Sequence, residues 1–456
     1  MEIPHTHIKK GRNLNILGEP LESVQAAPNT GRVALSAQSF PYIKPKLEVA
    51  VGDKVKIGQT LFHDKLHPEV KFVSPGAGTV VEINRGERRS LQNIIIELAA
   101  KEDSVSHRVL EGADFEGISL DELKSLMLEG GVWPYLRQRP FATLANPSVT
   151  PRSIFINGMS TEPLSAKMNV LLLNQKKAFH AGVKAMKRLT EGKVYLSVEK
   201  GDIEKIDAFT DLDGVDIHEF SGEHPAGNPS VHILHIERLK KGEVAWTINA
   251  VEVALIGRFL LEGKLPVERI IALAGPAVLE PKHYLTRSGA SIQDITKDKL
   301  TTHELLSYVS GSVLNGFLNS ETGYLAYYRC DLTVLAEGKT RELLGWMDPG
   351  ADKFSFSRSF LSALNPTKPL SVTTNIHGGL RAIVATDVYD KYLPLDIFAL
   401  PLIKAIIAED IDTAEKLGLL ECVPEDFALA SLMCPSKVDV CHIVQTGLEM
   451  IKKELE

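Results

Sequence analysis

The sequence predicts a multidomain protein that combines α/β and all-β units. Its 456 residues exceed the roughly 250–300 residues that one hydrophobic core holds, so we expect three or four domains. Short β-type runs fill the first hundred residues, and strands alternate with helical patterns after them. A composition with 44% hydrophobic and 24% charged residues is ordinary for a globular protein.

Two turn-and-strand units define the first segment. Residues 51–62 and 74–83 each join a Gly/Asp or Pro/Gly turn to a β-branched run, which predicts tight strand reversals. This pattern is typical of barrel-sandwich domains of the biotinyl and lipoyl type. Such domains can carry a group on a lysine, and Lys65 stands at the matching Asp-Lys position. Because residues 66–70 lengthen that turn and include Pro68, we expect Lys65 to be unmodified.

An α/β layer follows a polar linker at 99–117. Residues 120–131 form an amphipathic pattern that ends in glycine, which predicts a short helix. Residues 153–156 and 194–198 are predicted strands. Between them four apolar residues recur at helical spacing and should face the sheet: Phe179, Val183, Met186 and Leu189. This alternation predicts a layer built on a parallel sheet.

Composition shifts again near residue 267, where a compact β-rich unit begins and continues to about 333. The remainder is loop-rich and then helical, ending in a helix from 440. These shifts predict four domains, at 1–100, 101–266, 267–333 and 334–456.

Charge, apolar runs and cysteine spacing exclude several classes of protein. A net charge of −7 and the lack of a long Lys/Arg block argue against a nucleic-acid partner. No apolar run reaches the roughly 18–20 residues of a membrane-spanning helix, since Asp396 and Lys404 interrupt the best candidate. The start has no apolar leader, so no secretory signal is expected. The four cysteines show no CxxC spacing, which predicts free thiols in a reducing cytoplasm.

Motifs for cofactors are largely missing. There is no GxGxxG after a strand and no GxxxxGK[ST], so no phosphate-binding loop is predicted. The glycine-rich loop at 220–230 contains two prolines, which remove backbone donors. His232 and His235 lie in a run that reads as a strand, where they would face opposite sides and could not share a metal ion. We therefore expect no metal and no cofactor on this chain.

One cluster suits a flat amphipathic ligand. Residues 133–141 combine aromatic rings, prolines and two guanidinium groups. A quinone needs an apolar slot for its ring and tail and donors for its carbonyl oxygens. The alternative is a surface loop that anchors the linker helix to the α/β layer, and the residues alone favour this alternative.

The chain as a whole resembles the A subunits of bacterial sodium-translocating NADH:quinone reductases. The resemblance covers nearly the whole chain and depends on the order of seven motifs, at residues 8–11, 74–86, 137–141, 222–227, 273–276, 310–316 and 353–361. That family is similar to the C subunits of the Rnf complexes and to the flavin-bearing NADH-oxidising subunit of complex I. The resemblance implies a barrel-sandwich domain, a Rossmann-like layer, a ubiquitin-like β-grasp (SLBB) unit and a helical C-terminal part.

The same resemblance implies a function. The complex couples electron transfer from NADH to ubiquinone with Na+ transport from cytoplasm to periplasm. NADH, flavins and iron–sulfur centres would belong to other subunits, leaving this chain cofactor-free. It would lie peripherally on the cytoplasmic face of the inner membrane, bound chiefly to the membrane-embedded B subunit.

In that family, the segments that match 34–42 and 136–143 are associated with the quinone or inhibitor site. Carried over residue by residue, this implies five quinone-binding candidates, which are Phe40, Arg137, Arg139, Pro140 and Phe141. They would bind the quinone and would not act as acid–base catalysts.

Three departures mark the chain as divergent. The His224-Pro225 loop continues with Asn228-Pro229, the segment 282–285 lacks the family's two arginines, and Ala430 and Ser436 replace a cysteine and a glycine. Two other functions stay open: a free-standing flavin-dependent NADH dehydrogenase module, and a lipoyl or biotin carrier.

Overall fold

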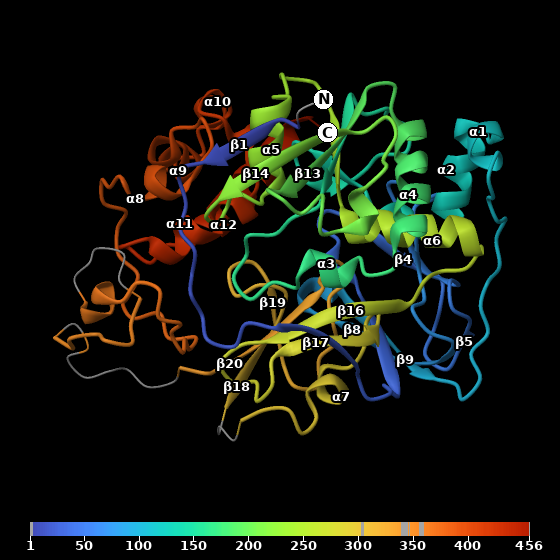
Figure 1. Ribbon diagram of the computed structural model, residues 1–456, viewed down its shortest axis with the longest axis horizontal. Helices are drawn as coiled ribbons and strands as arrows, with labels where there is room; N and C mark the ends of the chain where they lie inside the picture. The colour runs from blue at the N-terminus through green and yellow to red at the C-terminus, as the bar shows by residue number, and fades with distance from the viewer. Residues whose placement is uncertain (1–2, 302–304, 339–344, 346, 355–359, 456) are drawn as a thin grey trace.

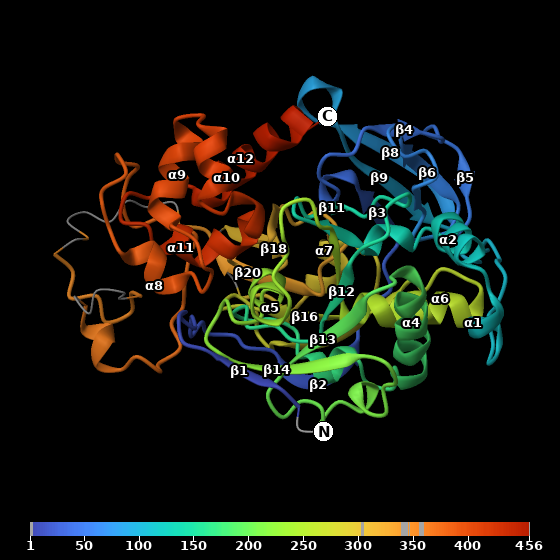
Figure 2. The same cartoon turned by 90° about the horizontal axis from the view of Figure 1, so that it is seen from above.

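A computed structural model describes residues 3–301, 305–338, 345, 347–354 and 360–455, so the central residues of the motif at 353–361 lie outside the described residues. Its strands form four sheets, of seven, six, four and three strands within the described residues. In both views the N-terminal barrel and most of the C-terminal helices lie on opposite sides of an α/β layer (Figures 1 and 2).

The α/β layer is built on the seven-stranded sheet. In spatial order its strands are β1 (His5–Ile8), β14 (Asp216–Gly222), β13 (Lys193–Glu199), β12 (Ser153–Asn157), β15 (Ala245–Asn249), β10 (Arg137–Arg139) and β11 (Thr143–Leu144). The first five run parallel, and β10 joins them antiparallel to β15. The predicted strands at 153–156 and 194–198 and the predicted parallel sheet are confirmed.

Two helices cover one part of this sheet. They are α4 (Lys176–Leu189) and α6 (Ala250–Glu262), and all four apolar residues predicted to face the sheet from α4 are buried. A Cβ at Gly182 would lie 2.0 Å from the Val253 carbonyl oxygen, and one at Gly257 would lie 1.8 Å from that of Ala178. The two glycines therefore let the helix backbones touch, and any side chain there would force them apart.

The barrel consists of two facing sheets. One has the order β3 (Arg32–Ser36), β9 (Leu91–Leu98), β8 (Gly78–Arg85) and β5 (Lys54–Val55), and the other β4 (Pro45–Leu47), β6 (Thr60–Asp64) and β7 (Lys71–Val73). The linker carries the short α1 (Asp114–Gly117) and then α2 (Leu120–Glu129), which confirms the predicted helix but ends two residues before its predicted end at 131. Ser119 and Glu122 cap α2 reciprocally, which fixes its start.

The six-stranded sheet has the order β19 (Phe317–Asn319), β18 (Leu306–Ser310), β20 (Asp331–Ala336), β16 (Glu268–Ala274), β17 (Lys282–Arg287) and β2 (Leu21–Ala26). Two short helices, α3 (Met168–Leu171) and α7 (Ile292–Thr296), lie beside it. Strands β1 and β2 thus leave the barrel segment and pair with strands about 215 and 260 residues away, respectively. The N-terminal segment therefore ties three parts of the molecule together.

The C-terminal part is helical at its end. Its helices are α8 (Val388–Tyr392), α9 (Ala399–Ile407), α10 (Ile411–Lys416), α11 (Ala428–Met433) and α12 (Val440–Leu455). They share a core with β1, β14 and α5 (Pro229–Ile236), through Ile8, Phe220 and Val231. At the far end of α12, the Lys452 Nζ lies 4.6 Å from the centre of the Tyr42 ring, so this helix reaches the barrel segment. Among the described residues, no helix is both long and apolar enough to cross a membrane.

The prediction of a strand at His232 and His235 was wrong. These residues lie on α5, which begins with Pro229 at its first position, where proline is well tolerated because it has no N–H to leave unbonded. His232 is buried and its Nε2 lies 3.0 Å from the Ala226 carbonyl oxygen, so its side chain hydrogen-bonds to the loop that precedes α5. Burial lowers the pKa of His232 to about 3.

Candidate functional site

Residues 133–136 and 139 of the segment at 133–141 are buried and the others half-buried, so the expectation of a surface loop is corrected. Trp133 and Tyr135 form the short 3-10 helix η3 (Trp133–Tyr135) and are almost completely inaccessible. The indole N–H of Trp133 donates to the Ala145 carbonyl (2.8 Å), and its ring meets that of Trp246 edge-on at 5.5 Å. This segment is therefore part of the core between the linker helix and the central sheet.

Four aromatic rings meet where the barrel, η3 and the six-stranded sheet converge. This aromatic junction consists of Phe40, Tyr135, Tyr327 and Tyr328. Ring centres of Phe40 and Tyr327 are 4.8 Å apart, those of Tyr135 and Tyr327 are 5.1 Å apart and stacked, and Phe40 meets Tyr328 at 5.6 Å. The rings come from three separate stretches of sequence, so packing alone brings them together.

Arg137 joins this junction from β10. Its guanidinium carbon lies 5.0 Å from the centre of the Tyr328 ring, a cation–π distance. Burial alone would lower the pKa of Arg137, but the carboxylates of Glu425 and Glu252 outweigh it and raise that pKa. Its Nε is buried and has no hydrogen-bond partner among the described residues. Two of the predicted site residues, Phe40 and Arg137, are thus brought to one place, where both contact the Tyr328 ring.

The other three candidates face the C-terminal part. Arg139 donates from Nη1 to the Ser230 hydroxyl (2.9 Å), and its Nη2 lies 3.5 Å from a Glu425 oxygen. Phe141 packs against the core of the C-terminal helices. Pro140 lies between them and is half-buried. The five predicted residues therefore lie in two places: Phe40 and Arg137 at the aromatic junction, and the other three against the C-terminal part.

A charged junction surrounds Arg139, and sequence reasoning missed most of it. It consists of Arg139, Glu162, Ser230, Asn315 and Glu425, which come from five different segments. The Asn315 amide donates to the Glu162 carboxylate. Burial, together with the nearby Asp331 and Glu425 carboxylates, raises the pKa of Glu162 to about 7, although Arg329 and the Asn315 bond act in the opposite sense. No motif marks Glu162, because it lies in a loop whose neighbours are distant in sequence.

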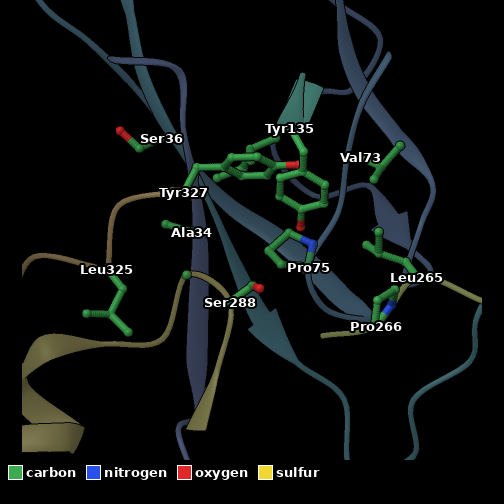
Figure 3. A pocket seen from close by; sticks show the side chains of 12 residues that line it. Ala34, Ser36, Val73, Pro75, Tyr135, Leu265, Pro266, Ser288, Leu325 and Tyr327 are labelled. Carbon is green, nitrogen blue, oxygen red and sulfur yellow. The ribbon is translucent and has the colours of Figure 1, made fainter. Parts of the chain in front are cut away.

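A narrow pocket opens beside the aromatic junction (Figure 3). Its space is about 400 Å³ when the open solvent at its mouth is counted, of which only about 20 Å³ is open to the centre of a water molecule; the barrel, η3 and the six-stranded sheet all contribute to its walls. The walls are mainly apolar, and their polar groups include the hydroxyls of Tyr135 and Ser288. In Figure 3 the Tyr135 hydroxyl points toward Pro75 and Ser288. A slot with apolar walls and a few fixed hydroxyls suits a flat, weakly polar ring.

Arg269 lies behind the pocket on β16. Its Nε donates to the Ser288 hydroxyl (2.7 Å) and its Nη2 to the Tyr135 hydroxyl (2.8 Å). The side chain is almost fully buried, and its guanidinium carbon is 5.5 Å from the Tyr135 ring centre. Arg269 therefore holds both pocket hydroxyls in place.

A second hollow lies between α6 and the β16–β17 pair. Its charged lining residues are Arg258, Glu268 and Arg269. Arg258 is paired with Glu262 and Glu268, each at 2.9 Å. Arg269 thus lies between the two hollows, and its hydrogen bonds go to the hydroxyls of the pocket of Figure 3. No group of three or more metal-binding side chains is found in the described part of the chain.

Comparisons with known proteins agree along the chain. Residues 6–99 match a family described as the NqrA N-terminal barrel-sandwich hybrid domain, 118–265 the NqrA second alpha/beta domain, and 270–319 the NQRA C-terminal domain. Curated proteins named as the A subunit of Na(+)-translocating NADH-quinone reductase, from Vibrio parahaemolyticus and Yersinia pestis, are 37% and 38% identical. Each alignment covers 98% of this chain and 99% of the relative. This chain belongs to that A-subunit family.

A further relative from Rhodopirellula baltica with the same name is 37% identical, and the alignment covers 98% of both chains. Among solved structures, an NAD+-reducing [NiFe]-hydrogenase matches 55% of this chain and 53% of its own at 13% identity, with a TM-score of 0.35. That match is too weak to support an argument about fold. The A-subunit resemblance seen in the sequence is confirmed by the curated relatives.

The departures from the family pattern have local partners in this chain. The Asn228 amide donates to Asp426 (3.1 Å), which links the divergent His224-Pro225 loop to the C-terminal part. The Ser436 hydroxyl donates to the Ala382 carbonyl (2.9 Å), and Ala430 is buried in the C-terminal core. In the segment 282–285, Lys282 pairs with Glu280 at 2.7 Å.

Proposed function

We propose that this chain is the peripheral A subunit of a sodium-translocating NADH:quinone reductase. In that assembly, electron transfer from NADH to ubiquinone is coupled to Na+ transport from cytoplasm to periplasm. The observation that carries the proposal is the match along 98% of the chain to relatives named for this subunit. An alignment of this length includes every domain of those relatives.

The partner subunits and the location belong to the same proposal. The membrane-embedded B subunit is the chief partner, and the chain lies on the cytoplasmic face of the inner membrane. An affinity-tagged chain purified from host membranes in mild detergent should bring down flavin-bearing membrane subunits with sodium-stimulated NADH:quinone reductase activity. A chain recovered alone and without that activity would contradict the proposal and favour a free-standing module.

We further propose that the aromatic junction and its pocket form or shape the ubiquinone site. Support comes from the pocket walls, which contain both residues 34–36 and Tyr135. Residues 34–36 belong to the first quinone-associated segment, 34–42, and Tyr135 directly precedes the second, 136–143. Phe40 and Arg137 both contact the Tyr328 ring beside this pocket. Arg139, Pro140 and Phe141 would hold the second segment in position from the side of the C-terminal helices.

The quinone site is tested by labelling. A photoreactive ubiquinone analogue bound to the purified full chain should crosslink to peptides that contain residues 34–36 or 135, and excess ubiquinone-1 should protect them. Replacing Leu265 by Trp would fill the pocket and should abolish labelling, whereas Leu279→Trp, at an exposed leucine, is the matched control. Labelling that persists in the filled pocket would place the quinone elsewhere.

We propose that this chain itself holds no cofactor and that NADH, flavins and iron–sulfur centres are bound by the other subunits. A flavin or iron–sulfur spectrum in the purified chain would contradict this and favour the flavin-dependent module. The carrier alternative requires a modified Lys65, whose side chain is exposed and whose backbone N–H bonds to the Lys44 carbonyl. An intact mass equal to that of the unmodified chain would exclude it.

The domain boundaries at 100, 266 and 333 are also proposed. The family matches at 6–99, 118–265 and 270–319 support them. We infer that the second domain is Rossmann-like, since its parallel strands alternate with helices, and that residues 267–333 form a β-grasp unit. Limited proteolysis should cut first near these boundaries if they separate compact units.

A further inference from the structure

Arg269 determines which hydrogen bonds the pocket can offer. A guanidinium group only donates hydrogen bonds and stays charged at any physiological pH. The oxygens of Tyr135 and Ser288 therefore both act as acceptors toward Arg269. As a result, neither hydroxyl can direct its own proton toward Arg269.

The hydroxyl protons must point elsewhere. For Ser288, whose oxygen borders the pocket, no acceptor for the proton is found within the described ranges. The Tyr327 hydroxyl shares a hydrogen bond with Tyr135 that raises the pKa of Tyr327, so Tyr327 is the donor and the Tyr135 oxygen the acceptor. That bond uses one of the two tyrosine protons and leaves the other. Burial raises the pKa of Tyr327 well above its usual value, so its hydroxyl stays protonated.

Two carbonyl oxygens on the pocket wall are already occupied. The Pro75 carbonyl accepts from Arg287 Nη2 (2.9 Å), and the Gly289 carbonyl accepts from the Ala34 backbone N–H (2.8 Å). The pocket thus presents hydroxyl donors, and these two acceptors are satisfied by the protein itself. A ligand that brings its own acceptors meets hydroxyl protons in this arrangement, whereas a ligand O–H meets, at these groups, only the second lone pairs of oxygens that already accept a hydrogen bond.

We propose that Arg269 is a positioning residue that makes this pocket selective for a flat ligand with carbonyl acceptors, so that it binds the oxidised quinone in preference to the quinol. This inference rests on the proposed quinone site. Oxidised and reduced forms have nearly the same shape and apolar surface, so the discrimination depends on the hydroxyl protons. Selectivity of this kind would favour entry of the substrate and release of the reduced product.

Affinities for the two redox forms provide the test. Binding of ubiquinone-1 and of ubiquinol-1 to the purified full chain is measured by titration calorimetry under anaerobic conditions. We expect the oxidised form to bind about tenfold more tightly. Tyr135→Phe and Ser288→Ala should each reduce this ratio about threefold or more, mainly by weakening ubiquinone-1 binding. Tyr308→Phe, at a buried tyrosine outside the pocket, is the matched control and should keep the wild-type ratio.

Variants of Arg269 separate positioning from folding. Arg269→Lys retains a buried cation with fewer donors and should keep part of the preference, whereas Arg269→Gln should bring the ratio close to one. If Arg269→Gln does not fold, the ratio in Tyr135→Phe and Ser288→Ala still decides the matter. Equal affinities in the wild type, or a ratio unchanged in both hydroxyl variants, would overturn the inference while leaving the quinone site intact. Binding of neither form would overturn the proposed quinone site and this inference with it.

Discussion

The aromatic junction and the charged junction receive residues from the same strand, yet they differ in kind. Arg137 and Arg139 are two positions apart on β10 and so face the same side of the sheet. Arg137 meets the Tyr328 ring, whereas Arg139 meets the Ser230 hydroxyl and Glu425. One short strand thus connects a region of stacked rings with a region of titratable groups.

This difference indicates how the two regions respond to their surroundings. Ring packing in the aromatic junction should change little with pH, since burial raises the pKa of Tyr328 and of Tyr327 above the usual tyrosine value. The charged junction contains Glu162, whose pKa is raised to about 7, so its charge changes near neutral pH. The first region is suited to hold a flat ligand, and the second makes the contact between domains sensitive to protons.

Removing a ring from the aromatic junction should have the largest effect. Phe40 is 3% exposed and contacts Phe72, Tyr327 and Tyr328. We expect Phe40→Ala to lower the free energy of unfolding by about 4 kcal/mol, because it loses buried surface and leaves a cavity. Urea denaturation at pH 7 measures this change. Phe40→Leu fills most of the space and should cost about 1 kcal/mol; equal losses in both variants would mean that ring packing is not what holds this junction.

The charged junction should depend on Arg139 instead. The Arg139 side chain is 5% exposed, so Arg139→Ala would remove a buried cation that bonds to the Ser230 hydroxyl and lies 3.5 Å from Glu425. We expect a loss of about 3 kcal/mol in the free energy of unfolding. At a subdenaturing temperature, the ratio of ubiquinone-1 to ubiquinol-1 affinity should stay at its wild-type value. A ratio that falls with Arg139→Ala would show that the two junctions act as one site.

The sequence predicted best those elements whose signal is local. The helix at 120–129 and the strands of the α/β layer follow from capping residues and periodicity within one segment. The run at 231–237 was misread because short apolar runs do not distinguish a strand from a buried helix. Pro229 at the start of α5 was the signal that could have corrected it.

The placement of strands and of the site was beyond such reasoning. β1 and β2 look like ordinary strands of the first segment, but their partners lie in β14 and β17. The pocket combines Ala34, Tyr135, Ser288 and Tyr327, which no spacing rule relates. Family resemblance indicated Phe40 and Arg137, while Arg269 and Glu162 emerged only from the packing of three domains.

Titration should separate the two junctions further. The pKa of Glu162 is raised from its usual 4.5 to about 7 in the folded chain, so the unfolded chain loses this proton more readily. The free energy of unfolding should therefore fall as the pH rises from about 4.5 to about 7. Glu162→Gln removes this dependence and keeps a partner for Asn315. We expect Glu162→Gln to be about 2 kcal/mol more stable than wild type at pH 8 and nearly equal to it at pH 5. Thermal denaturation between pH 5 and 8 measures this.

His224 also titrates differently in the folded chain, because burial lowers its pKa to about 4. It is present in both proteins, so it should leave the stability difference between wild type and Glu162→Gln unchanged. A stability difference that does not vary with pH would contradict the raised pKa of Glu162.

The smallest expected effect concerns the border of the aromatic junction. Arg287 holds the Pro75 carbonyl and also pairs with Glu102 of the linker at 2.7 Å. The bond to Arg287 and one from the Ala77 backbone outweigh burial and lower the pKa of Glu102, so the pair stabilises the fold at neutral pH and loses this effect in acid. We expect Glu102→Gln to cost about 1 kcal/mol at pH 7, because both partners keep some contact with water. Glu111→Gln, at an exposed linker position, is the control and should change the unfolding midpoint very little. A Glu102→Gln variant that matches the control in stability but loses the preference for ubiquinone-1 would show that the linker acts on the pocket through Arg287 and Pro75, and not on the fold.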